Sequence, residues 1–449
     1  MSAAPGNPPD AGDLVELSVG EAAHGGWCVA RAADHGQVIF VRHALPGERV
    51  RAVITQTTAK LARADAVEIL EAAASRVEPP CPQARPGRCG GCDWQHASLP
   101  AQRELKAAVV SQQLRRIAGI ERQVTVEQVP GDTAGLRWRT RVKFAVRPDG
   151  TAGLRKHRSH EVIDVGDCPI AHPLVDAAGV TGLTWPGGRW VEVTAAPGSG
   201  DRAVMVSPRT DRRARSRGRG QGARRGTGGG PGALGGGYLR QQAAGRDWRV
   251  SAAAFWQVHP GAADTLAAAV LDALRPQPGA VALDLYCGAG LFAGVLATAV
   301  GPAGTVIGME QDRQAVRDAR HNLRATPWAR VHCGDAGELL ARHGQSGASL
   351  AVLDPPRTGL PRPVIDLLSE PLRTGGDGAA DGAADGAPGQ AAAGLHRIAY
   401  VSCDPATLAR DLALLCARGW DLQGLRAFDA FPMTHHVECL ATLERGTGQ

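Results

Sequence analysis

Ten cysteines are the side chains of this 449-residue sequence best suited to chemistry. Four of them form one set, each beside proline or glycine: Cys81, Cys89 and Cys92 in CPQARPGRCGGC, and Cys168 in GDCPIAH. Three clustered thiols with a distant fourth form a soft four-ligand set, which suits either zinc or an iron-sulfur cluster. The spacing differs from the paired CxxC of a zinc ribbon, so the residues alone leave a cluster, zinc and unliganded thiols open.

A second set of reactive side chains follows the predicted strands of the carboxyl-terminal half. The run DLYCGAG at 284–290 ends one strand and starts a helix, and its glycines allow close backbone approach to a ligand. Glu310 ends the next strand, where a carboxylate can accept both hydroxyls of a ribose. Asp335, Asp354 and Cys403 follow the third, fourth and fifth strands. Because ligands bind at the carboxyl ends of parallel strands, these groups should converge on one crevice that suits a dinucleotide or S-adenosylmethionine (SAM).

Three regions must position these groups. From residue 251 onward, AVALDLYC, GTVIGME, ARVHCGD, SLAVLDPP and HRIAYVSC alternate with helix-forming stretches, which predicts a parallel, doubly wound α/β sheet over 251–449. Residues 12–74 alternate short apolar runs with Gly and Pro breaks, the pattern of a small closed β-barrel. Residues 78–250 are mixed, with a helical stretch at 102–117 and strand-like pieces after it. The sequence therefore predicts a barrel, a mixed α+β central domain and an α/β domain.

Low-complexity segments interrupt this plan. The tail 1–11, the Arg-rich then Gly-rich insert 209–237 and the Asp-Gly-Ala insert 375–394 cannot bury enough apolar surface to offset their ordering entropy, so we expect them to be disordered. Residues 209–225 hold eight arginines and one aspartate, and they account for most of the formal net charge of +6. The charge total therefore says little about partners.

The amino terminus, MSAAPGNPPDAGDL, lacks a basic patch followed by an apolar core, and no apolar run approaches about 18 residues. We therefore expect a cytoplasmic, monomeric protein with no membrane partner. Disulfides are rare in that compartment. The other cysteines lie in apolar segments and are predicted to be core residues: Cys28, Cys287, Cys333, Cys416 and Cys439.

At the level of motifs the sequence resembles a known family. The runs DLYCGAG, DPPRTGL, SCDPATLARDL and FPMTHHVE, in this order, resemble the RNA 5-methyluridine methyltransferases of the TrmA and RumA type, including the RlmD-like enzymes. The segment from GDLVELSV to AVEIL resembles the TRAM domain, an OB-like barrel appended to RNA-modifying enzymes. The resemblance implies a Rossmann-like SAM methyltransferase domain behind a TRAM barrel. It also implies the residues that hold SAM: Gln257, Tyr286, Glu310, Asp335 and Asp354.

The resemblance also implies the catalytic pair. Uracil C5 is too poor a nucleophile to take a methyl group from a sulfonium unaided. A thiolate that adds to C6 creates an enolate whose C5 can attack SAM, and a base then removes the C5 proton. The family's motifs place the nucleophile at Cys403 and the proton acceptor at Glu438, with Arg357 and Asp354 in a secondary contact to the base or a phosphate.

The GGCDWQH context and the distant fourth cysteine resemble the 4Fe-4S site of the RumA-like branch. By that likeness the cluster ligands are Cys81, Cys89, Cys92 and Cys168. A barrel together with a cluster favours a uridine of structured RNA, most of all 23S rRNA, which must be flipped out of its stack to be reached. The alternatives are a tRNA uridine methyltransferase, a catalytically inactive RNA-binding iron-sulfur protein, and a DNA cytosine C5 methyltransferase, which shares the thiolate step.

Overall fold

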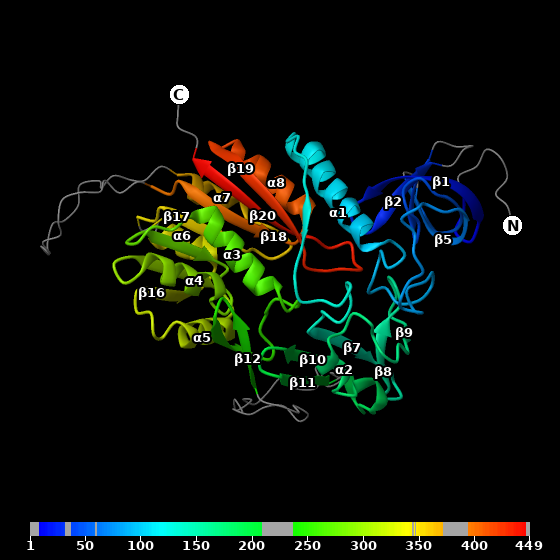
Figure 1. Cartoon of the computed structure of the whole chain (residues 1–449), viewed down its shortest axis with the longest axis horizontal. Helices are drawn as coiled ribbons and strands as arrows, with labels where there is room; N and C mark the ends of the chain where they lie inside the picture. Colours follow the sequence, from blue (N-terminus) through cyan, green and yellow to red (C-terminus); the bar gives the residue numbers. More distant parts are fainter. Residues whose placement is uncertain are drawn as a thin grey trace, which may run out of the picture.

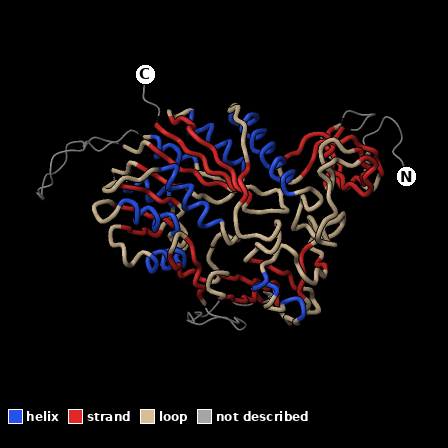
Figure 2. Tube along the Cα trace, viewed as in Figure 1, coloured by secondary structure: helices blue, strands red, loops and turns tan. Residues whose placement is uncertain are grey.

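A computed structural model describes the chain in seven stretches: residues 9–31, 37–58, 61–208, 237–343, 345, 347–370 and 394–445. In it the chain forms three parts around a central region of loops (Figures 1 and 2). Disorder was expected for 1–11, 209–237 and 375–394, and these segments lie almost wholly outside the described residues. No helix among the described residues is long and apolar enough to span a bilayer.

The first part is a closed five-stranded barrel in the order β1-β2-β3-β5-β4. Its strands are β1 (Leu14–Ala23), β2 (Trp27–Arg31), β3 (Val38–Arg42), β4 (Arg49–Thr57) and β5 (Leu61–Glu71). On β4, Val50, Ala52 and Ile54 are buried while the residues between them are more exposed. This alternation follows from the two-residue period of a strand, and it gives the barrel an apolar interior, as the sequence predicts.

The central part is an antiparallel five-stranded sheet in the order β11-β10-β7-β8-β9. The segment that leads to it, residues 72–98, is called here the cysteine loop. It ends at helix α1, which packs against the α/β part (Figure 1). The elements of this part are α1 (Leu99–Gln113), η1 (Leu114–Ala118), β7 (Arg141–Val146), β8 (Ala152–Arg155), β9 (Val162–Ile163), α2 (Pro173–Asp176), η2 (Val180–Gly182), β10 (Gly188–Ala196), β11 (Asp201–Pro208), and the hairpin β12 (Tyr238–Ala243) with β13 (Arg246–Ser251).

The third part is a Rossmann-like sheet in the order β16-β15-β14-β17-β18-β20-β19-β6. The first five strands are parallel to one another, and β20 runs antiparallel to both of its neighbours. Its strands are β6 (Val126–Gln128), β14 (Val281–Leu285), β15 (Thr305–Glu310), β16 (Ala329–Cys333), β17 (Leu350–Leu353), β18 (Arg397–Ser402), β19 (Trp420–Asp429) and β20 (Glu438–Arg445). Its helices are α3 (Ala262–Leu274), α4 (Leu291–Val300), α5 (Arg313–Asn322), α6 (Ala336–His343), α7 (Arg362–Ser369) and α8 (Pro405–Cys416).

Helices cover both faces of this sheet. One apolar cluster joins α3, α4 and α5 to one face, and a second joins α6, α7, α8 and α1 to the other. The strands between them are continuous apolar runs: the four residues of β17, LAVL, are all buried. Strands that are buried on both faces need such runs, so the structure confirms the predicted doubly wound sheet.

The five cysteines predicted to lie in the core have different environments. Cys28, Cys287 and Cys439 are buried as predicted, whereas Cys333 is exposed and Cys416 is half-buried. Cys333 ends β16, the edge strand of the sheet, and Cys416 is the last residue of α8. The prediction was wrong for Cys333 because an apolar run does not reveal that its strand lies at an edge.

Helix α1 fixes the loop between β19 and β20, residues 430–437. Lys106 Nζ donates to Asp429 Oδ1 at 2.5 Å and to the Phe431 carbonyl at 3.0 Å, and both charged side chains are almost fully buried. Gln102 Oε1 accepts from the Met433 backbone N–H at 2.8 Å. Two side chains from the first quarter of the chain therefore determine the path of a loop near its end.

Replacing Lys106 with Met should lower the stability of the α/β part by about 3–5 kcal/mol, because Asp429 is left buried without its cation. The double variant Lys106→Met/Asp429→Leu should recover most of the loss, since it removes both charges. Urea and thermal unfolding midpoints measure the change, with Glu104→Met on the exposed side of α1 as the control. Equal stability of Lys106→Met and the wild type would contradict this role for the pair.

Candidate active site

A cavity of about 740 Å³ lies at the carboxyl ends of the parallel strands, a size typical of small-molecule sites. The cysteine loop contributes Gly90 and Gly91 to its wall, and the segment before β7 contributes Trp138 and Arg139. Six of the residues predicted from the sequence line it: Gln257, Tyr286, Glu310, Asp354, Cys403 and Glu438. A seventh, Asp335, lines an adjoining cavity that shares Tyr286 and Glu310 with the first. The fold thus brings the predicted cofactor and catalytic residues to one crevice.

The turn after β14 forms one side of this cavity. Tyr286 has a left-handed backbone with φ of 65°, and its N–H donates to the Met309 carbonyl at 2.9 Å. Glu310 is fixed by two backbone donors, because Oε2 accepts from the Gly288 N–H at 3.0 Å and Oε1 from the Asp312 N–H at 2.8 Å. A carboxylate oxygen can accept more than one hydrogen bond, so both oxygens of Glu310 keep capacity for two neighbouring hydroxyls.

Three acidic groups lie together on the opposite side. Burial and the neighbouring Glu438 raise the pKa of the Cys403 thiol to about 12, although Arg357 opposes the change. Burial, with a contribution from Asp354, raises the pKa of Glu438 well above its ordinary value. Burial alone raises the pKa of Asp354 to about 7. Burial therefore favours the neutral form of each of these groups, and Arg357 acts in the direction of ionisation for both Cys403 and Glu438.

The loop that leads to Glu438 is fixed from the cysteine loop and the barrel. Asp93 Oδ2 lies 2.6 Å from His435 Nδ1 and accepts from the His435 N–H at 3.2 Å, while Asp93 Oδ1 accepts from Arg42 of the barrel at 3.3 Å. Burial alone would raise the pKa of Asp93, but His435 and Arg42 hold it at about 2. His436 lines the cavity, and burial together with nearby His435 and Arg357 lowers its pKa to about 3. The two histidines thus shape the loop.

The barrel also reaches the residue after Cys403. His24 Nε2 lies 3.5 Å from Asp404 Oδ2, and Asp404 caps α8 by accepting from the Thr407 N–H at 2.9 Å. Sequence reasoning missed the parts that His24, Arg42 and Asp93 play. No local motif marks them, because their partners lie far away along the chain.

The four cysteines predicted as ligands line one small cavity between the cysteine loop and the segment after β9. Burial raises the pKa of Cys168 to about 11 and also raises those of Cys89 and Cys92, with neighbouring thiols contributing. Among the described residues, no three His, Cys, Asp or Glu side chains are grouped closely enough to hold a single metal ion. The fold gathers these thiols without forming a compact single-ion site.

Comparison with family models gives three matches along the chain. Residues 11–67 match the TRAM domain, residues 385–446 match tRNA (Uracil-5-)-methyltransferase, and residues 257–339 match protein-L-isoaspartate(D-aspartate) O-methyltransferase. The first match covers most of the barrel, and the other two fall within the α/β part.

Similar proteins extend over almost the whole chain. An uncharacterized RNA methyltransferase of Streptomyces avermitilis is 46% identical over 96% of this chain and 98% of its own length. The 23S rRNA (uracil(1939)-C(5))-methyltransferase RlmD of Halomonas elongata is 32% identical over 96% of this chain and 89% of its own. The crystal structure of the tRNA (uracil-54, C5)-methyltransferase of Pyrococcus abyssi, in complex with S-adenosyl-L-homocysteine, covers 95% of this chain and 100% of its own, with a TM-score of 0.64 and 20% identity. At that identity the likeness speaks for the fold alone.

Alkylation of Cys403 by iodoacetamide should be slow at neutral pH and should accelerate about tenfold per pH unit up to about pH 10, because only the thiolate reacts. Arg357→Gln should slow it further, since Arg357 favours ionisation of the thiol. Mass spectrometry of the modified peptide measures the rate, and the exposed Cys333 controls for reagent activity. A rate that levels off near pH 8.5, as for a free thiol, would contradict the effect of burial.

Proposed function

The chain belongs to the family of SAM-dependent RNA (uracil-C5) methyltransferases, and from this premise we propose that it methylates C5 of one uridine in 23S rRNA through a covalent bond from Cys403 to C6. The observation that carries the proposal is the presence of Cys403, Glu438 and Glu310 in one cavity. A nucleophile, a proton acceptor and a partner for a ribose are the three groups that this reaction needs.

The cofactor half of the proposal assigns SAM to the turn after β14. Glu310 would accept from the ribose hydroxyls, because both of its oxygens are held by backbone donors and still have free acceptor capacity. Tyr286 and Asp335 would bound the adenosine side, since they line the smaller cavity that opens from Glu310. Gln257 and Asp354 would face the methionine end, because they line the main cavity towards Cys403.

In the catalytic half, Cys403 Sγ adds to C6 of uracil and pushes electron density towards C5. C5 then takes the methyl group of SAM, the sulfonium carbon–sulfur bond breaks, and S-adenosylhomocysteine leaves. Glu438 accepts the C5 proton as a carboxylate, and the C6–S bond breaks to release Cys403 as a thiolate. The net products are a methylated base, S-adenosylhomocysteine and one proton.

This sequence requires Cys403 and Glu438 to ionise in a site that disfavours charge. Arg357 supports ionisation of both groups. The sulfonium of bound SAM adds a second positive charge to the same cavity, and a nearby cation lowers the pKa of an acid. We therefore propose that cofactor binding favours ionisation of Cys403 and Glu438, which keeps the thiol unreactive until then.

Two observations support 23S rRNA over the alternatives. The RlmD of Halomonas elongata, named for 23S rRNA, is 32% identical over 96% of this chain, whereas the tRNA enzyme of Pyrococcus abyssi is 20% identical and covers 95% of it. A catalytically inactive RNA-binding protein would have no need of a thiol and a carboxyl group in contact with one cavity. A tRNA uridine remains the second candidate because the carboxyl-terminal part matches the tRNA (Uracil-5-)-methyltransferase model.

Incubation with labelled SAM and separate pools of undermodified 23S rRNA, tRNA and DNA should label 23S rRNA, with 5-methyluridine at one position. Cys403→Ala should lower the rate by at least about 10³-fold, because the chemical step loses its nucleophile, and should bind SAM as tightly as the wild type. Cys439→Ala, a buried neighbour on β20, is the matched control and should stay active. Label in tRNA or DNA alone, or turnover by Cys403→Ala, would contradict the proposal.

We also propose that Cys81, Cys89, Cys92 and Cys168 hold a 4Fe-4S cluster. In its support, all four line one small cavity. A tetrahedral zinc with Zn–S near about 2.3 Å needs its sulfurs almost in contact, and no such compact group occurs among the described residues. A four-iron cluster is larger than one ion and suits thiols that stand further apart. The cluster would have a structural role, because methyl transfer has no redox step. It would hold the cysteine loop to the segment that carries Cys168.

Protein purified without oxygen should contain about four irons and matching sulfide per chain, with broad visible absorbance. Cys168→Ser should lose the iron and lower the thermal midpoint, because the segment after β9 is no longer tied to the cysteine loop. The exposed Cys333→Ser should keep the iron. Stoichiometric zinc in place of iron, or protein with no metal at all, would overturn the assignment.

A further inference from the structure

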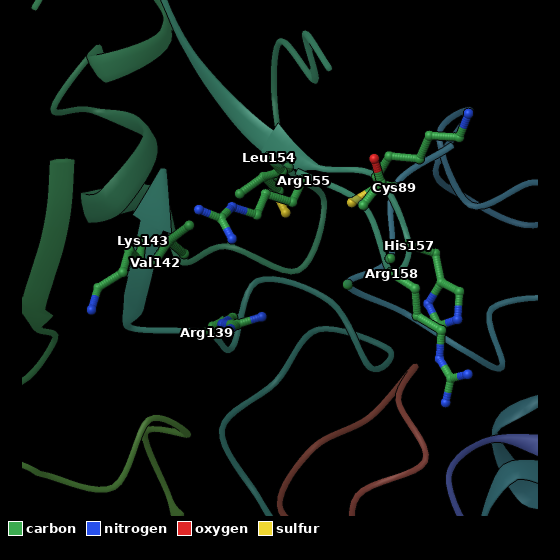
Figure 3. Close-up of a pocket in the computed structure, with 13 residues that line it drawn as sticks. Cys89, Arg139, Val142, Lys143, Leu154, Arg155, His157 and Arg158 are labelled. Atoms are coloured by element: carbon green, nitrogen blue, oxygen red, sulfur yellow. The ribbon is translucent and has the colours of Figure 1, made fainter. Parts of the chain in front are cut away.

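Resting on the proposed function, we propose that a second, basic pocket beside the catalytic cavity binds a backbone phosphate of the substrate RNA strand. The basic pocket is named for six of its lining side chains, Arg139, Lys143, Arg155, Lys156, His157 and Arg158, and Cys89 and Cys168 of the proposed cluster site also line it. It has a volume of about 340 Å³ and opens to solvent between the cysteine loop and the central sheet. Figure 3 shows Lys143 and Arg139 on one side of it, with His157 and Arg158 on the other.

The basic pocket and the catalytic cavity share a wall. Gly90, Gly91 and Arg139 line both of them, so one strand of RNA can contact both without leaving the surface. A flipped uridine that reaches Cys403 leaves its neighbouring phosphates within a nucleotide or two of the cavity mouth. The basic pocket is therefore where those phosphates would lie.

The positive charges of the basic pocket are largely uncompensated. No aspartate or glutamate lines it. Lys143 pairs with Glu192 at 2.9 Å and Lys156 with Glu161 at 3.6 Å. Among the described residues, the guanidiniums of Arg139, Arg155 and Arg158 form no ion pair with a carboxylate. Arg139 donates to the Arg141 carbonyl, and Arg155 contacts the ring of His160. Three cations without anions around one concave surface form an anion site rather than a solvated face.

The turn that carries these cations is held in a strained shape. Arg158 has a left-handed backbone, with φ of 49°, which costs energy for a residue with a side chain. The cysteine loop supports the turn, because the His157 N–H donates to the Arg88 carbonyl at 3.2 Å and the Gly90 N–H to the Arg155 carbonyl at 3.3 Å. A Cβ on Gly90 would lie 2.7 Å from the His157 Cα, so only glycine fits there.

The barrel adds further positive charge next to Arg158, through Arg63. The guanidiniums of Arg158 and Arg63 lie over the ring of Trp27, at 5.3 Å and 5.7 Å from its centroid. Burial and the nearby Arg63 and Arg42 lower the pKa of Arg158, as expected where cations crowd together without an anion. His157 Nε2 is buried and has no hydrogen-bond partner among the described residues. A phosphodiester group in the basic pocket would relieve this crowding of cations.

The ligand class follows from this geometry. Contacts from guanidinium and ammonium groups to backbone phosphates carry no sequence information, so the basic pocket would hold the strand in register while the catalytic cavity selects the base. The role is positional, and its loss should appear in RNA binding rather than in the chemical step.

Arg158→Gln removes one cation and keeps a polar side chain of similar length. We expect the KM for the substrate RNA to rise about fivefold, while kcat at saturating RNA stays unchanged. A change of about fivefold corresponds to the largest free energy typical of an exposed ion pair. In salt titrations with a fluorescent single-stranded oligoribonucleotide, the slope of log K against log salt should become shallower by about 0.7 per lost contact. Arg202→Gln, an exposed arginine on β11 at the far edge of the same sheet, is the matched control.

Two outcomes would overturn the proposal. An Arg158→Gln protein with the wild-type salt slope and KM would show that the basic pocket contacts no phosphate. Loss of iron in Arg158→Gln, with RNA binding unchanged, would assign these cations to the charge of the cysteine site instead. The oligoribonucleotide titration does not require turnover, so it still tests the basic pocket if the wild type methylates none of the RNA pools and the proposed function fails.

Discussion

The buried carboxylate of Asp93 connects all three parts of the molecule. It belongs to the cysteine loop, accepts from Arg42 of the barrel and contacts His435 in the loop that leads to Glu438. A Cβ on Gly26 of the barrel would lie 2.7 Å from the Asp93 Cβ, so the barrel approaches this point as closely as a glycine permits. A buried charge is tolerated only where its partners are in place, which makes the arrangement of the three parts a condition for the site to exist.

Within the candidate active site, burial and the cation of Arg357 act in opposite directions on the ionisation of the acidic groups. Burial favours the neutral forms of Cys403, Glu438 and Asp354, while Arg357 favours ionisation of the first two. An enzyme that uses a thiolate and a carboxylate in a closed cavity therefore depends on charge brought by its ligands. Under the proposed function, this balance would keep the Cys403 thiol unreactive until the cofactor binds.

Much of the fold could be predicted from local patterns. The alternation in β4 predicts a barrel, and apolar runs such as LAVL in β17 predict strands buried between two layers of helices. Long-range pairings could not be predicted. β6 is only three residues long and joins the far edge of the sheet beside β19, about three hundred residues later. Helix α1 covers a face of that sheet although it belongs to the preceding part of the chain. Such pairings depend on packing between distant segments, and the periodicity of apolar residues along the chain does not indicate it.

For the site, the residue types indicate which groups could react, and the order of the motifs predicts that Cys403, Glu438 and the strand-end carboxylates belong to one centre. The tertiary structure decided their protonation, the loop contacts from Asp93, Gln102 and Lys106, and the neighbouring basic pocket. It also determines which cysteines are buried, and Cys333 is exposed at a sheet edge. The physical reason is that residue type and spacing fix local geometry and intrinsic reactivity, whereas burial and electrostatic environment are set by residues that only folding brings near.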